Sequence, residues 1–164
     1  MDLPNLLGRL TQIYFCSVQR ASFVFAINLL LSTYILERRD VYKRQPHGCA
    51  NAIYLPYVIK YNAKDPVAAS RYAEIARRMG LEGTSQQALI NSLCEKIDSF
   101  NVKLNIPKTL KEFGINEEEF KEKVAKIAEL AVGDACTGSN PRAIDPANME
   151  KLLTCTFYGT EVDF

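Results

Sequence analysis

The feature that most constrains this fold is the stretch from Pro46 to Asn62, which reads PHGCANAIYLPYVIKYN. A helix drawn over about Cys49 to Tyr61 carries apolar residues on nearly every side, so it has no broad polar face to turn toward water. Such a helix is stable only where other elements cover it all round. Pro56 lies inside it, removes one backbone donor, and is expected to kink it.

The same stretch contains His47, the only histidine among 164 residues. A histidine at the start of a buried helix can ligate a metal, but a lone histidine more often packs and hydrogen-bonds. A protein metal site usually takes three or four ligands, so His47 would need partners from elsewhere. A Ser-His-Asp or Cys-His site would also require His47, and no residue is fixed as its orienting partner. From the residues alone, these interpretations stay open.

The composition is that of one globular domain with a sizeable core, because 48% of the residues are apolar and 24% are charged. The formal net charge of +1 and the lack of a basic stripe with interleaved aromatics argue against a nucleic-acid partner. The five cysteines are widely spaced and form no CxxC pair. This pattern disfavours a thiolate zinc site and favours free thiols in a reducing compartment such as the cytoplasm.

Residues 1–45 differ in composition from the rest of the chain. The uncharged run from Ala21 to Leu36 has 16 residues, fewer than the roughly 20 that span a bilayer. Three interpretations of this segment are open. A signal peptide is disfavoured because the start is weakly basic and no small-residue cleavage site follows the apolar run. Residues 10–36 could anchor a non-catalytic helical interaction module in a membrane. Alternatively, because Arg39 to Gln45 resembles a translated sequencing-adapter remnant, residues 1–45 are unrelated or artefactual sequence. We favour this last interpretation.

From His47 onward the sequence predicts consecutive helices. Asp65-Pro66 and Asp145-Pro146 each place a capping acceptor before a proline in the first helical position. Asn116 precedes three glutamates, with Glu119 in the capping-box position, and Thr84 with Gln87 predicts a second capping box. Breakers are expected to end these helices: Gly80, Asn105 to Pro107, Gly114 and Gly159. Because no strand pattern follows residue 46, the predicted fold is mainly α, with five or six helices.

The segment 133–142, GDACTGSNPR, allows two interpretations. Its small polar residues and single arginine suit a loop that lines a cleft. They also suit a helix–helix connection in which Thr137 and Asn140 satisfy the ends of helices, and from the residues alone we favour this second interpretation.

Two separated motifs resemble the iron-containing alcohol dehydrogenases. Pro46-His47-Gly48, followed by Ala50-Asn51-Ala52, Leu55-Pro56 and Tyr61-Asn62, resembles the last metal-ligand motif of that family. The segment 134–142 resembles a second hallmark, and the segments 72–76 and 106–110 are also similar. The ending through Tyr158-Gly159-Thr160 resembles the alcohol dehydrogenase half of bifunctional aldehyde/alcohol dehydrogenases, or a close stand-alone relative of that half. The resemblance covers residues 46–164.

This resemblance implies the helical C-terminal domain of the dehydroquinate synthase-like, iron alcohol dehydrogenase fold, without its α/β cofactor domain. It implies interconversion of a primary alcohol and its aldehyde with NAD(H). The metal, Fe2+ or Zn2+, would be held by one Asp and three His and would act as a Lewis acid. His47 would be the last of those histidine ligands, and Cys136 would lie in the loop that approaches the substrate pocket.

The resemblance further implies a cytoplasmic homo-oligomer that takes a small alcohol or aldehyde and has no membrane or nucleic-acid partner. The sequence before Pro46 does not resemble the family. We therefore expect residues 46–164 to be the C-terminal fragment of such an enzyme, inactive in isolation. Its helices would expose apolar stripes that the rest of the enzyme normally covers.

Overall fold

The computed structural model describes residues 45–135 and 137–164, and these residues form helices but no strands. The elements are α3 (Gln45–Asn62), α4 (Pro66–Arg78), α5 (Gln86–Lys103), α6 (Glu117–Gly133), the 3-10 turn η1 (Thr137–Ser139) and α7 (Pro146–Tyr158). The predicted mainly helical fold is confirmed. The candidate anchor at 10–36 lies outside the described residues, and none of the described helices is long and apolar enough to cross a membrane.

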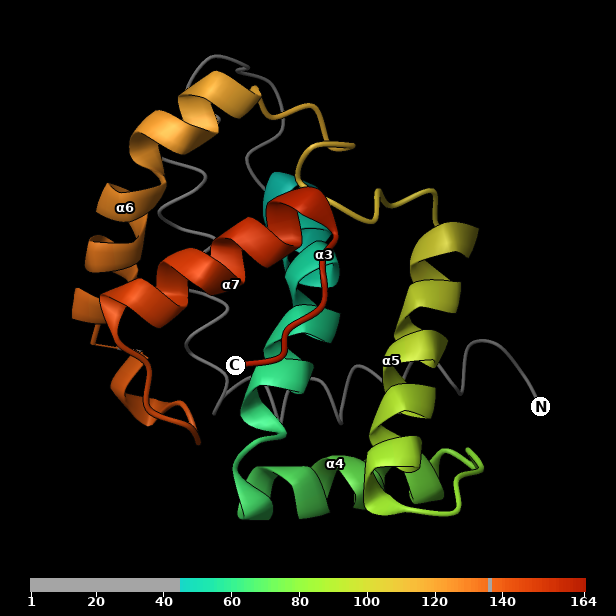
Figure 1. The fold of residues 1–164 in the computed structure, drawn as a ribbon. Coiled ribbons are helices and arrows are strands. Elements are labelled where there is room, and N and C mark those ends of the chain that lie inside the picture. The colour runs from blue at the N-terminus through green and yellow to red at the C-terminus, as the bar shows by residue number, and fades with distance from the viewer. Residues whose placement is uncertain (1–44, 136) are drawn as a thin grey trace.

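Helix α3 is the centre of the domain. Figure 1 shows it between the crossed pair α6 and α7 and the helix α5, with α4 lying across its C-terminal end. Ile53, Tyr54 and Val58 of α3 belong to one core cluster with α6 and α7. Ile59 belongs to a second cluster with α4 and α5. The helix is apolar all round because it packs into two cores at once, so the predicted burial is confirmed.

Helix α3 continues through Pro56 and starts four residues before the predicted Cys49, at Gln45. A proline at position 56 leaves the carbonyl of Ala52 without its helical donor. The side chain of Asn101, in α5, donates to that carbonyl oxygen at 2.9 Å and is 8% exposed. The neighbouring helix thus supplies the hydrogen bond that the proline removes.

Most predicted helix starts are confirmed. The carboxylates of Asp65 and Asp145 each accept a backbone N–H three residues ahead, at 2.8 and 2.7 Å. Asn116 caps α6 in the same way at 3.0 Å. The capping box predicted at Thr84 is wrong, because α5 is capped by Ser85.

The error at α5 arises from two adjacent hydroxyl residues that both fit the capping pattern. Ser85 has an extended backbone (φ −137°, ψ 167°), which lets its hydroxyl accept the N–H of Ala88 at 3.1 Å. Gln87, the predicted partner in the capping box, donates instead to Asn91 within the helix.

The predicted helix stops at Gly80, Asn105 and Gly159 are confirmed, since their φ values of 72°, 55° and 77° are left-handed.

Candidate functional site

The structure places His47 in the first turn of α3. The side chain of His47 lies outside the described residues, as does the whole of Cys136, so the roles assigned to both remain predictions. Among the described side chains, no group of three or more His, Cys, Asp or Glu could hold a metal ion. The described residues therefore do not form a complete iron site.

Tyr54 lies seven residues after His47, which is almost two helical turns and places both residues on one face of α3. Tyr54 is fully buried, and its hydroxyl is the buried side-chain polar atom that lacks a hydrogen-bond partner in the described structure. Burial raises the pKa of Tyr54 well above its usual value. The phenol therefore stays protonated and is a potential hydrogen-bond donor on the face of α3 that carries His47.

The described part of the 133–142 loop packs on the other end of α3. The side-chain amides of Asn140 and Asn62 exchange two hydrogen bonds, at 2.9 and 2.8 Å. The hydroxyl of Thr137 donates to the carbonyl of Ala131, in the last turn of α6. Thr137 therefore satisfies the end of α6, as the second interpretation of the loop sequence predicts, whereas Asn140 bonds the Asn62 side chain and the Arg142 carbonyl instead of a backbone group at a helix end.

Arg142 completes this contact. Its guanidinium Nη1 donates to the backbone carbonyl of Tyr61 at 3.0 Å and to the main-chain oxygen of Phe164, the last residue of the sequence, at 2.9 Å. The guanidinium also stacks 4.0 Å from the centre of the Tyr61 ring. The Tyr61 hydroxyl in turn donates to the carbonyl of Ala143 at 2.7 Å. Burial raises the pKa of Tyr61, and the positive charge of Arg142 opposes that rise. A cation at the C-terminal end of α3 is also favoured by the helix dipole.

The loop contact and His47 lie at opposite ends of α3. Asn62 lies 15 positions after His47, which corresponds to about 22 Å at 1.5 Å per residue. The structure therefore does not bring the described loop residues next to the first turn of the helix. The sequence analysis named Arg142 only as part of the loop and missed its contact with Tyr61. The available signal was that Tyr61 and Asn62 belong to the same family motif as His47, although they lie at the other end of the helix.

A hollow of about 230 Å³ lies between α3, α5 and the chain after Gly159. Charged side chains line it: Lys60, Lys108, Asp98 and Glu161. Burial raises the pKa of Asp98, and the two lysines partly oppose the rise. Two cations and two anions balance one another, so the hollow has no preference for a ligand of either sign.

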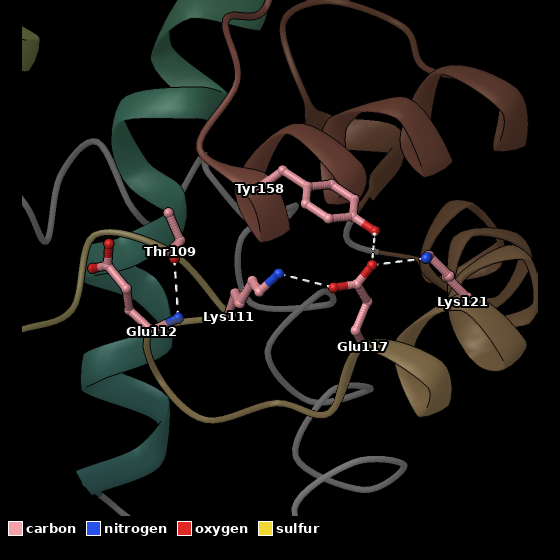
Figure 2. A network of polar contacts seen from close by, with 6 residues as sticks. All are labelled: Thr109, Lys111, Glu112, Glu117, Lys121 and Tyr158. Carbon is pink, nitrogen blue, oxygen red and sulfur yellow. Dashed lines mark hydrogen bonds and ion pairs between the residues drawn. The ribbon is translucent and has the colours of Figure 1, made fainter.

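A second polar network joins the start of α6 to the end of α7 (Figure 2). The carboxylate of Glu117 accepts from Lys111 at 2.8 Å, Lys121 at 2.7 Å and the Tyr158 hydroxyl at 3.0 Å. These hydrogen bonds lower the pKa of Glu117 to about 2. The lysines and the tyrosine are exposed, so this network is a solvated contact between helices and not a binding site.

Known proteins match this chain over most of its described residues. A sequence model of the Fe-containing alcohol dehydrogenase family, C-terminal, matches residues 41–157. An NADPH-dependent butanol dehydrogenase of Clostridium saccharobutylicum is 56% identical over 119 residues, which are 73% of this chain and 30% of that protein. The bifunctional aldehyde-alcohol dehydrogenase AdhE of Escherichia coli K12 is 37% identical over 131 residues, 71% of this chain and 15% of that protein. The chain thus spans less than a third of the length of these relatives.

Solved structures share the fold. An iron-containing alcohol dehydrogenase from Thermococcus thioreducens superposes with a TM-score of 0.67 at 30% identity, covering 84% of this chain and 32% of that one. A 1,3-propanediol oxidoreductase superposes with a TM-score of 0.68 at 26% identity, covering 82% and 32%.

Proposed function

Because this chain belongs to the Fe-containing alcohol dehydrogenase family, whose C-terminal domain it matches over residues 41–157, we propose that residues 46–164 are the helical domain of an enzyme that interconverts a primary alcohol and its aldehyde. The observation that carries this proposal is the 56% identity to a butanol dehydrogenase over 119 residues. The agreement in fold with the solved iron-containing enzyme supports it. Residues 1–45 lie outside the proposed domain.

In the complete enzyme, bound Fe2+ would polarise the oxygen of the substrate as a Lewis acid. We assign His47 as one ligand and place Cys136 in the loop beside the substrate. The described side chains contain no three-ligand group, so the other ligands would come from other parts of the enzyme, and this domain alone accounts for no step at the metal. The domain by itself is expected to be inactive.

The redox partner is proposed to be a nicotinamide cofactor. The family resemblance implied NAD(H), whereas the butanol dehydrogenase is named as NADPH-dependent. The described cysteines, Cys49, Cys94 and Cys155, are free thiols, which fits the cytoplasmic setting proposed for the enzyme. A membrane-anchored module would rest on residues 10–36, and no described contact or relative favours it.

A chimera tests this function. Residues 46–164 would replace the matching 119 residues of the Clostridium butanol dehydrogenase, and reduction of NADP+ and of NAD+ by 1-butanol would be followed with Fe2+ under anaerobic conditions. We expect turnover by the chimera and none by the 164-residue chain alone. A folded chimera without turnover would refute the proposed activity, and robust turnover by the chain alone would refute its inactivity.

The role of His47 is tested in the same chimera. His47→Ala is expected to lose bound iron, measured by elemental analysis, together with turnover. Cys49→Ala is the matched control, because it removes a half-buried free thiol two residues along the same helix. An H47A chimera that retains its iron would show that His47 is not a ligand.

A further inference from the structure

Arg142 joins three segments that are distant in sequence. Its own loop, 137–143, follows α6, while the two main-chain oxygens that accept from it belong to Tyr61, at the end of α3, and to Phe164, in the tail after Gly159. The tail is held along its length, since Val162 is buried in the core and the carbonyl of Asp163 accepts from Lys64 at 3.4 Å. One guanidinium therefore lies where helix, loop and tail meet.

The chemistry of arginine suits this position. A planar guanidinium can stack on the Tyr61 ring while its N–H groups reach carbonyls in different directions, which the single ammonium of a lysine cannot do with the same geometry. The Tyr61 carbonyl is one of the last four of α3, which lack their usual helical donors. It accepts the backbone N–H of Lys64 at 3.3 Å and the Arg142 guanidinium at 3.0 Å. Arg142 thus caps α3 from a different part of the chain.

We propose that Arg142 is a positioning residue that fixes the 137–143 loop on α3, the helix whose first turn carries His47. Asn140 provides the second attachment through its paired amides with Asn62. This inference rests on the proposed function, which places Cys136, the residue just before this segment, in the loop beside the substrate. It adds that the loop is held in place by α3 and the tail rather than by its own short turns.

The test is amide hydrogen exchange on the 164-residue chain. The amides of Thr137 and Asn140 report on the loop, because they donate to the carbonyls of Asp134 and Thr137, both at 3.0 Å. Arg142→Ala is expected to speed their exchange by about 10- to 100-fold, the loss that corresponds to hydrogen bonds from a charged donor. The amides of α4 and α5 should keep their rates.

Two further variants separate positioning from general stabilisation. Arg142→Lys should restore part of the protection, since it keeps the cation but not the planar fork. Lys151→Ala is the matched control: Lys151 is exposed on α7, and its ammonium lies 5.6 Å from the Phe164 ring. It should leave loop exchange unchanged. Asn140→Ala removes the second attachment and keeps Arg142, so it should also speed amide exchange in the loop. This variant keeps the proposal testable if R142A does not fold.

Unchanged loop exchange in R142A, or an equal rise in α4 and α5, would overturn the local role. In the butanol dehydrogenase chimera, R142A is expected to lower kcat/KM, and wild-type kinetics despite a freed loop would overturn the positioning role. Exchange requires no turnover, so failure of the proposed alcohol chemistry would be recognised by an inactive parent chimera, independently of the exchange result.

Discussion

The hydrogen bond between Asn101 and the carbonyl of Ala52 is the sharpest test of how α3 tolerates a proline. The bond is 2.9 Å long, and Asn101 is 8% exposed. Asn101→Ala removes the donor and leaves a shielded carbonyl that Pro56 has already deprived of its helical partner. A buried polar group left without a partner costs about 1–3 kcal/mol, so we expect N101A to lower the free energy of unfolding by about 2 kcal/mol.

If Asn101 replaces the donor that Pro56 removes, the effects of substitutions at positions 56 and 101 on the free energy of unfolding must be coupled. In a Pro56→Ala background, residue 56 regains an N–H that can donate to Ala52, so N101A should cost less there. The coupling energy between the two substitutions should be about 1–2 kcal/mol. Urea denaturation followed by far-UV circular dichroism on the four proteins measures it. If the two effects add to within about 0.5 kcal/mol, the proline and the asparagine are independent and the reasoning is wrong.

Three further outcomes are expected. The pKa of Glu117 is lowered from 4.5 to about 2, so its contacts stabilise the fold above the normal pKa and are lost as the pH falls through about 2; a carboxyl NMR midpoint near 4.5 would contradict this. Burial raises the pKa of the Cys94 thiol to about 12, so iodoacetamide at mildly alkaline pH should label Cys49 and spare Cys94, as peptide mass spectrometry would show. Gly159→Ala should destabilise more than Gly80→Ala by about 1 kcal/mol or more in urea titrations. Both glycines have positive φ, but only at Gly159 would the new Cβ meet a side-chain atom at 2.9 Å; equal losses would argue against the clash.

The helices were predictable because their signals are local. Asp65, Asn116 and Asp145 each cap a helix through an N–H three residues ahead, a contact that depends on the neighbouring residues alone. The mistake at Thr84 has the same origin, since Ser85 offers an equivalent hydroxyl and a pattern does not choose between neighbours. The family was also recognisable from the sequence, through the motif around His47 and the loop at 134–142.

The sequence by itself determined that the stretch from Pro46 to Asn62 contains a helix, over about Cys49 to Tyr61, that must be covered on all sides. Only the tertiary structure decided what covers it, with α6 and α7 packed in one core and α4 and α5 in the other. The partners of Ala52 and Tyr61 lie 49 and 81 residues away. Contacts at such separations depend on how whole helices pack, and that packing is decided by the combined burial of many side chains rather than by any local pattern.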